Sequence, residues 1–199
     1  MSRITVSLHV LFMLASLGVC RGDSWGPPSA KIFASDDGNR ALKIVPIRGE
    51  GFTFTSTATW IRLNHDGSEQ ALNQFKLPNA PMRILIPERG VNFFVTIDSH
   101  ARLGGDHTLV IYRSGGQVVR DLKLENLLTA TEILDHVKHT VSSRWWREGA
   151  AFVFEVPTTE TIVDKGRFVR SEYEEAKLHL VFPWGKRVVV KLATGEVLP

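Results

Sequence analysis

The fold is predicted most clearly by the stretch from Glu88 to Leu128. It reads Glu88-Arg-Gly-Val-Asn-Phe-Phe-Val-Thr-Ile-Asp98, then a loop through Gly104-Gly-Asp106, then Thr108-Leu-Val-Ile-Tyr-Arg-Ser-Gly-Gly-Gln-Val-Val-Arg120 and Leu122-Lys-Leu-Glu-Asn-Leu-Leu128. Side chains 93–97 alternate between two faces and predict a half-buried strand. β-Branched and aromatic residues follow at 108–112, and the two glycines after them permit a tight reversal. The stretch therefore predicts three short strands, two of them in a hairpin, with a helical turn leading out.

Further strands are predicted on both sides of this stretch, so the fold class is mainly β with antiparallel sheets. The strands are expected at 32–34, 41–45, 52–63, 71–77, 151–156, 178–182 and 187–192, bounded by turn residues. We expect Pro46 to end the strand before it, because proline cannot donate to a strand ladder. Thr129-Ala-Thr-Glu132 is typical of a capping box and predicts one helix near 130–139. The polar residues 158–175 predict a long loop or an exposed hairpin.

Glycine turns divide the chain into about three similar β-meander units. Gly38, Gly90 and Gly149 each lead into a strand, at offsets of 52 and 59 residues, and a second turn follows at Gly67, Gly115-Gly116 and Gly185. Offsets of this order are typical of propeller blades. An all-β protein with regularly spaced turns would give the same pattern, so both interpretations stay open.

Two segments resemble a known repeat. Ala34-Ser-Asp-Asp-Gly-Asn-Arg-Ala-Leu-Lys-Ile44 resembles the start of a repeat in TolB-like and WD40-like β-propellers, and residues 110–120 resemble the outer hairpin of such a blade. Three units are fewer than the about 4 to 8 blades of a closed propeller. The resemblance therefore implies an open propeller-like body, or a sandwich-like or barrel-like body, that serves as a binding scaffold.

The first 22 residues have the layout of a secretory signal peptide. Arg3 precedes an apolar run from Ile4 to Val19, and small residues follow near a cleavage site at 20–22. This predicts a secreted, periplasmic or cell-envelope protein without a membrane span in the mature chain, with a linker at 23–30 and a single β-rich domain at 31–199. A lipid anchor on Cys20 is the alternative, but Val19 stands where such a signal usually has glycine or alanine.

Composition limits the classes of partner. The chain has 199 residues, 43% of them hydrophobic and 23% charged, which suits one domain with a sizeable core. Cleavage would remove the one cysteine, so no disulfide is expected in the mature chain. Lys and Arg fall from 24 to 22 on losing Arg3 and Arg21, against 21 acidic residues, which leaves about +1. No basic run or stripe indicates nucleic acid.

One candidate site is a group of metal-ligand residue types around the central loop. It comprises Asp98, His100, Asp106 and His107, with His139 after the predicted helix. Imidazole and carboxylate groups are common ligands of zinc and similar ions. The alternative is structural: the histidine complements a helix C-terminus, and the aspartates accept hydrogen bonds from loop amides. Catalytic and phosphate-binding motifs are missing from the sequence, and no cofactor is predicted.

The second candidate site is a binding surface at Arg144-Trp145-Trp146-Arg147. One indole is expected in the core and its neighbour at the surface, where tryptophan and arginine suit recognition of a protein or glycan. Plain packing is the alternative. Together these features predict an exported binding or scaffold protein, with a homodimer possible through an edge strand. The alternative is a metal-binding protein or a metal-assisted hydrolase that uses the 98–107 loop and His139.

Overall fold

The computed structural model describes residues 25–35, 38–51, 53–64, 66–87, 91–156, 163–164, 167–168 and 175–198. The predicted signal peptide, including Cys20, and most of the polar segment 158–174 lie outside these residues. The helices are α2 Leu124–Leu127 and α3 Ala130–His136. The strands are β1 Lys31–Ala34, β2 Arg40–Arg48, β3 Phe54–Leu63, β4 Glu69–Leu77, β5 Pro81–Leu85, β6 Phe93–Ser99, β7 Leu109–Arg113, β8 Val118–Leu122, β9 Ala151–Glu155, β10 Val163–Asp164, β11 Arg167–Phe168, β12 Lys177–Val181, β13 Arg187–Lys191 and β14 Val197–Leu198.

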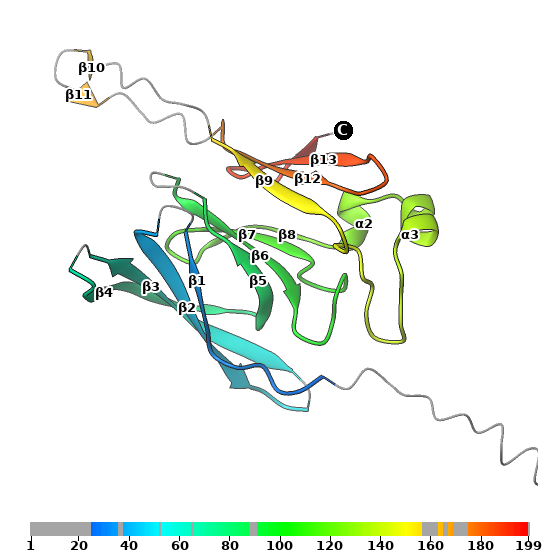
Figure 1. Ribbon diagram of the computed structural model, residues 1–199, viewed down its shortest axis with the longest axis horizontal. Helices are drawn as coiled ribbons and strands as arrows, with labels where there is room; N and C mark the ends of the chain where they lie inside the picture. The colour runs from blue at the N-terminus through cyan, green and yellow to red at the C-terminus, as the bar shows by residue number, and fades with distance from the viewer. Residues whose placement is uncertain are drawn as a thin grey trace, which may run out of the picture.

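Three antiparallel four-stranded meanders make up the body of the molecule (Figure 1). The first sheet has the order β1-β2-β3-β4, the central sheet β5-β6-β7-β8, and the third sheet β9-β12-β13-β14. The strands β10 and β11 form a separate two-stranded sheet. In the sequence they lie between β9 and β12, the first two strands of the third sheet. Within the described residues none of the sheets closes into a barrel. The predicted fold class, mainly β with three meander units, is confirmed.

The central sheet lies between the other two (Figure 1). One core cluster joins it to the first sheet and contains Phe94, Val110 and Tyr112 from its strands. A larger cluster joins its other face to the third sheet and the helices, and contains Phe93 and Ile97. Every residue of β6 is buried as a result. The expectation of a half-buried strand is wrong here, because side-chain alternation cannot show that a second sheet covers the other face.

Glycine turns punctuate the sheets, but the third sheet differs from the expected repeat. Gly67 joins β3 to β4, and Gly116 lies in the turn from β7 to β8, so both connect the third and fourth strands of their sheets. In the third sheet this connection contains Gly195, whereas Gly185 joins the second strand to the third. The predicted equivalence of Gly185 is therefore wrong. The reason is that Gly149 precedes β9, the first strand of its sheet, whereas Gly38 and Gly90 each precede the second strand of theirs.

Strand β2 runs through Pro46, so the predicted end of the strand at this proline is wrong. It continues to Arg48, with Pro46 opposite Ser56 of β3. The neighbouring strand β1 begins at Lys31, opposite Ile44, so the far side of Pro46 has no strand partner among the described residues. Proline is compatible with such an edge because no ladder hydrogen bond is needed there. Two strands, β5 and the short β14, were not predicted.

Helix α3 begins as predicted. Thr129 accepts a hydrogen bond from the Glu132 amide, and the Glu132 side chain accepts one from the Thr129 amide, which completes the capping box. The helix ends at His136, three residues before the predicted end. Neither described helix has the length and apolar character needed to cross a lipid bilayer.

Candidate functional site

The two candidate sites of the sequence meet at Asp98, near the end of β6. Its carboxylate is fully buried, and Oδ1 accepts hydrogen bonds from the Gly104 amide at 2.7 Å and from Trp146 Nε1 at 2.8 Å. The Nε atom of Arg147 lies 2.9 Å from Oδ2 and forms an ion pair. One side chain thus joins β6, the loop 100–108 and the segment 137–150. The role that these contacts indicate for Asp98 is to hold the two loops together.

Burial raises the pKa of Asp98 above its ordinary value, because a carboxylate loses hydration in the core. The hydrogen bonds from Gly104 and Trp146 and the charge of Arg147 act in the opposite direction. The backbone of Asp98 has a φ of 55°, in the left-handed region. Aspartate and asparagine tolerate this region better than most residues. Both the side chain and the backbone of this position therefore depend on its residue type.

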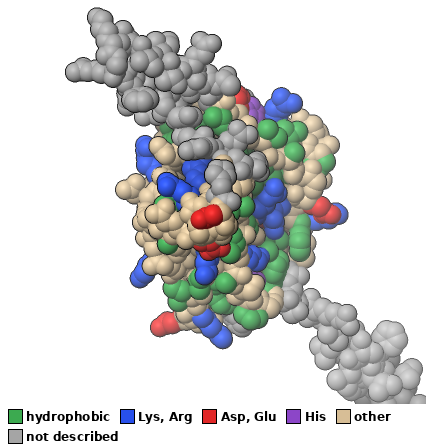
Figure 2. All heavy atoms as spheres, turned by 60° about the vertical axis from the view of Figure 1, so that its left-hand side comes forward, with side chains coloured by type: hydrophobic (Ala, Val, Ile, Leu, Met, Phe, Trp, Pro, Cys, Tyr) green, Lys and Arg blue, Asp and Glu red, His purple; other side chains and the backbone are tan. Residues whose placement is uncertain are grey.

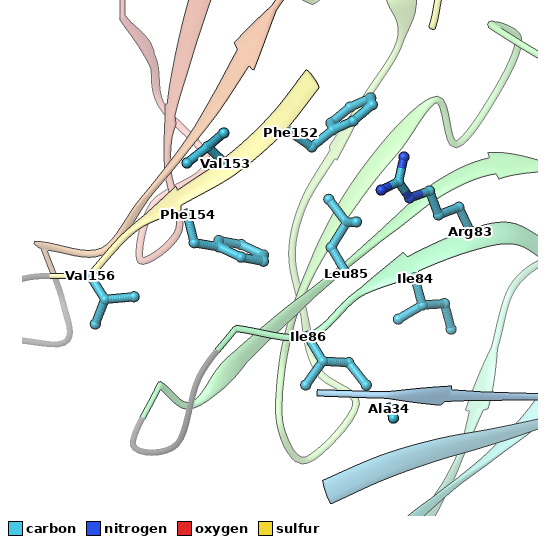
Figure 3. A pocket seen from close by; sticks show the side chains of 9 residues that line it. All are labelled: Ala34, Arg83, Ile84, Leu85, Ile86, Phe152, Val153, Phe154 and Val156. Atoms are coloured by element: carbon cyan, nitrogen blue, oxygen red, sulfur yellow. The ribbon is translucent and has the colours of Figure 1, made fainter. Parts of the chain in front are cut away.

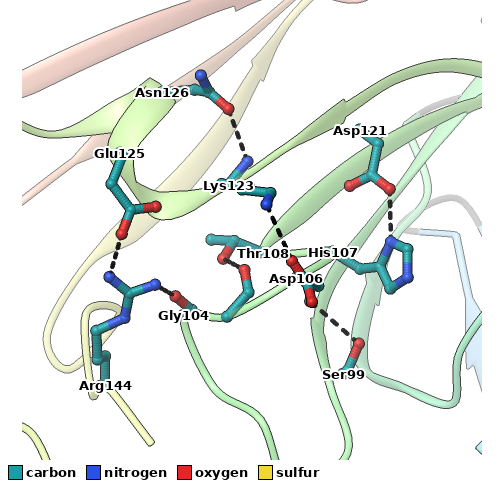
Figure 4. A network of polar contacts seen from close by, with 11 residues as sticks. Ser99, Gly104, Asp106, His107, Thr108, Asp121, Lys123, Glu125, Asn126 and Arg144 are labelled. Carbon is teal, nitrogen blue, oxygen red and sulfur yellow. Dashed lines mark hydrogen bonds and ion pairs between the residues drawn. The ribbon is translucent and has the colours of Figure 1, made fainter.

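Gly104 allows the two loops to approach each other closely. It has a φ of 64°, and a Cβ atom there would lie 2.9 Å from Arg144 Cβ and 3.2 Å from Trp146 Cδ1. The Arg144 guanidinium donates a hydrogen bond to the Gly104 carbonyl and pairs with Glu125 of α2 (Figure 4). A larger residue at 104 would separate these contacts. Glycine is therefore required where the loop 100–108 contacts the segment 137–150.

The predicted metal-ligand residues do not all come together. His100, Asp106 and His107 line one small pocket of about 140 Å³, together with neighbours that include Asn79 and Ser99. Asp98 and His139 are not among its lining residues. No group of three or more His, Cys, Asp or Glu side chains that could hold a metal ion occurs in the described part of the chain.

Each of the three pocket residues has another partner. His100 Nε2 lies 2.7 Å from the Gly26 carbonyl oxygen. Asp106 forms an ion pair with Lys123 at 3.3 Å, and His107 Nδ1 lies 2.5 Å from a carboxylate oxygen of Asp121 (Figure 4). These contacts tie the loop 100–108 to β8 and to the N-terminal segment. The arrangement serves to position the loop, and the metal site stays a prediction.

The predicted binding surface divides between the core and the exterior. Trp146 is 1% exposed and packs in the core between the central and third sheets, with Phe152 and Phe182 as ring neighbours at 5.9 and 6.2 Å. Trp145 is 40% exposed. The sequence predicted this division of the two indoles. The two flanking arginines form the internal ion pairs described above, which leaves Trp145 as the exposed apolar group of the tetrad.

Trp145 borders an open depression on the surface. The volume is about 690 Å³, and we call this surface the Trp145 face; its lining residues are Lys138, His139, Thr140, Trp145, Arg147 and Glu148. Lys138 and Glu148 form an ion pair across it at 3.2 Å. The ring of Trp25 stacks on the Trp145 indole with a centroid distance of 6.2 Å and an interplanar angle of 21°. Trp25 lies in the predicted linker, and no sequence pattern pointed to its contact with Trp145.

The charged side chains form no single patch in the view of Figure 2. Basic side chains lie in several separate groups on this face, with apolar and other side chains between them. Many cations in the described residues also have acidic partners, such as Lys177 with Glu155 and Lys186 with Glu132. The basic side chains on the face shown therefore form no continuous stripe.

Comparisons of the chain with protein-family models, with curated proteins and with solved structures find no match in any of the three. What is established of its class is the architecture, a mainly β chain whose described residues form three antiparallel four-stranded meanders.

Proposed function

We propose that this protein is an exported, non-catalytic binding module that recognises a glycan through the Trp145 face. The observation that carries the proposal is an exposed indole whose chain neighbour, Trp146, is fully enclosed in the core. Large aromatic side chains at a surface are enriched in recognition sites, because one flat ring supplies much contact area with few rotatable bonds.

The Trp145 face is held rigid before any ligand arrives. Trp146 and Arg147 both bond to the Asp98 carboxylate, and Trp25 stacks on one face of the Trp145 ring. A side chain that is already ordered loses little conformational entropy on binding. This preorganisation supports a recognition role for Trp145 over incidental exposure.

The chemistry of the Trp145 face suits a sugar chain. An aromatic plane can pack against the C–H groups of a pyranose ring, while polar neighbours bond to its hydroxyls. Lys138, His139 and Glu148 supply donors and acceptors beside the indole. The depression is open to solvent, which fits a chain of sugars better than an enclosed small molecule.

Export and architecture complete the proposal. Residues 1–22 would direct the chain out of the cytoplasm. Polysaccharides are common ligands of proteins outside the cytoplasm. We take the three meanders as propeller-like units that act as a rigid scaffold. Binding sites are frequently built on loops that such a scaffold holds in place.

Binding to soluble polysaccharides tests the proposal. The mature chain is titrated by isothermal calorimetry with a neutral β-glucan, a chitin oligosaccharide and polygalacturonate, so that neutral, N-acetylated and acidic sugars are compared. We expect at least one to bind, and we expect Trp145→Ala to weaken that binding at least tenfold through loss of the stacking surface.

Val141→Ala is the matched control, because Val141 is a fully exposed apolar residue on the same segment and does not line the Trp145 face. It should bind as the wild type does. Val141→Ala should unfold at the wild-type denaturant concentration, and Trp145→Ala should keep the wild-type far-ultraviolet circular dichroism spectrum. The proposal fails if no sugar of the panel binds, or if the Trp145→Ala variant keeps wild-type affinity.

A further inference from the structure

A second surface lies where β1, β5 and β9, the first strands of the three sheets, come together. In each sheet this is the edge opposite the last strand, which is β4, β8 or β14. This groove, which we call the edge groove, has a volume of about 530 Å³ (Figure 3). Its lining comes from the first strand of each sheet and the residues that follow β5 and β9: Ala34, Arg83, Ile84, Leu85, Ile86, Phe152, Val153, Phe154 and Val156.

The strands around the edge groove have open edges. β1 pairs only with β2, β5 only with β6, and β9 only with β12 among the described strands. Backbone hydrogen bonds join none of β1, β5 and β9 to one another in the described residues. An open edge presents N–H and C=O groups that another extended chain can pair with. The edge groove therefore offers main-chain hydrogen bonds as well as side-chain contacts.

The side chains of the edge groove are apolar with one exception. Figure 3 shows Phe154 and Leu85 pointing toward one another from facing strands, with Ile86 close by. Val153, on the edge strand β9, is 54% exposed. Such exposure on an edge strand marks a place where another strand can add.

Arg83 gives the edge groove its charge. It is an exposed residue of β5, and its guanidinium lies 5.2 Å from the centroid of the Phe152 ring. No acidic residue lines the edge groove, and the described residues provide no ion pair for Arg83. A cation beside apolar side chains and open strand edges is complementary to an extended peptide that carries a carboxylate.

We propose that the edge groove binds an extended segment of a partner protein, which adds to the third sheet along β9 and places an acidic side chain on Arg83. The peptide becomes a fifth strand next to β9, and alternate apolar side chains fill the space between Phe154 and Leu85. Main-chain hydrogen bonds supply affinity in this mode, and side-chain pockets supply selectivity. The Trp145 face has no residue in common with the edge groove, so the two proposals stand or fall separately.

Fluorescent octapeptides of alternating valine and threonine, with a central Glu, Gln or Lys, test this proposal by anisotropy. We expect the Glu peptide to bind about tenfold more tightly than the Gln peptide, with the Lys peptide weakest. An analogue with alternate backbone amides N-methylated should lose binding, because it cannot donate to the β9 edge. Equal binding of the N-methylated analogue would overturn strand addition.

Variants of the protein make the test specific. Arg83→Gln should remove the preference for Glu over Gln. Arg113→Gln is the matched control, since Arg113 also lies over an aromatic ring, at 5.3 Å from the Phe93 centroid, but outside the edge groove. It should leave the preference unchanged. A preference that persists in Arg83→Gln would overturn the assignment of the acidic contact.

Two further results would contradict the proposed occupant. Light scattering that shows a wild-type dimer, dissociated by Val153→Lys, would identify a second copy of this chain as the occupant. Strong hydrogen-exchange protection of all β9 amides in the isolated protein would show that the chain fills the edge groove itself. The proposal is supported if the protein is a monomer, if its β9 edge amides exchange readily, and if the protein binds the Glu peptide.

Discussion

The two faces of β6 contact their neighbouring sheets in different ways. Toward the first sheet, Phe94 stacks on Tyr112 at 4.8 Å and meets Trp60 and Phe75 at 5.6 and 5.7 Å, so aromatic rings lie at the centre of a cluster that also holds aliphatic side chains. Toward the third sheet, the buried side chains are mostly aliphatic, with Phe93, Trp146 and Phe182 among them. The second interface includes a buried carboxylate, Asp98, at its border, whereas the first includes the buried phenol of Tyr112. We call these the aromatic interface and the Asp98 interface.

The difference indicates what each interface responds to. The aromatic interface depends on buried area and ring geometry, which change little with pH or salt. The Asp98 interface includes a carboxylate whose three partners belong to two loops, so its strength depends on charge and on loop conformation. The proposed recognition residue, Trp145, is attached to the second interface. The proposed recognition residue and the buried carboxylate therefore lie on the same side of the central sheet.

The largest effect is expected at the aromatic interface. Phe94→Ala should lower the free energy of unfolding by about 4 kcal/mol, because it removes a buried ring and leaves a cavity among three others. Urea denaturation monitored by far-ultraviolet circular dichroism measures the change. Phe75→Ala is the comparison variant, since Phe75 is only half-buried, and its cost should be clearly smaller. Equal costs would show that the interface does not centre on Phe94.

The second largest loss of stability is expected when the buried carboxylate of Asp98 is removed. Asp98→Ala should cost about 3 kcal/mol at pH 7, because it leaves the Gly104 amide, Trp146 Nε1 and Arg147 without their acceptor. Asp98→Asn should cost less, since an amide oxygen accepts two of these bonds and asparagine tolerates the positive φ. Denaturant titration compares the two. An Asp98→Ala cost no greater than that of Asp98→Asn would contradict the assigned role.

The pH dependence of stability in the wild type and in Asp98→Asn is a separate check on the role of the carboxylate. Burial raises the pKa of Asp98 in the folded protein above 3.8, so the unfolded chain releases this proton at lower pH than the folded chain does. The folded wild type therefore loses stability relative to Asp98→Asn as pH rises through the window between 3.8 and the raised pKa. Stability curves of both proteins over this window provide the measurement.

Much of the fold was readable from local sequence. The strands at 93–97 and 109–113, the glycine hairpin at 115–116 and the capping box at Thr129 follow from residue patterns within a few positions. Burial of both faces of β6 could not be predicted from these local patterns, because it depends on the first and third sheets. Strand β5 was missed because prolines at 78 and 81 indicated a loop.

Part of the candidate site could be predicted from the sequence. Both of its segments, the loop after Asp98 and the tryptophan pair, were identified from residue type. That they contact each other was not predictable, since Asp98 and Trp146 are 48 residues apart in the chain. The sequence predicts Asp98 either as a metal ligand or as an acceptor for loop amides, and the Gly104 amide does donate to it. Its indole and guanidinium partners could not be foreseen, because they belong to a distant segment.

A smaller effect is expected from closing the space between the two loops. Gly104→Ala should cost about 2 kcal/mol, because alanine is strained at a positive φ and its Cβ meets Arg144 and Trp146. Gly38→Ala is the matched control, since Gly38 also has a positive φ, of 68°, but has no atom within 4 Å of the added Cβ. The difference between the two variants isolates the loop contact. A difference of zero would mean that the loops adjust freely.

The smallest effect concerns Glu125, at the edge of the Asp98 interface. The hydrogen bond from Arg144 holds the pKa of Glu125 below its usual value of 4.5. A lowered folded pKa means that the stabilisation is present above 4.5 and is lost as pH falls through the folded pKa. The side chain is more than half exposed, so the contribution at pH 7 should be well under about 1 kcal/mol.

Comparing two variants over pH separates the interfaces. The cost of Glu125→Gln should decline between pH 7 and pH 3, as the pH falls below 4.5 toward the lowered folded pKa, because protonation removes the charge that pairs with Arg144. The cost of Phe94→Ala should stay constant over the same range, since burial raises the pKa of the Tyr112 phenol on which its ring stacks, and this phenol stays neutral there. Urea titrations at each pH measure both. A Phe94→Ala cost that also declines with acid would show that the aromatic interface depends on charge, and the distinction between the two faces of β6 would not hold.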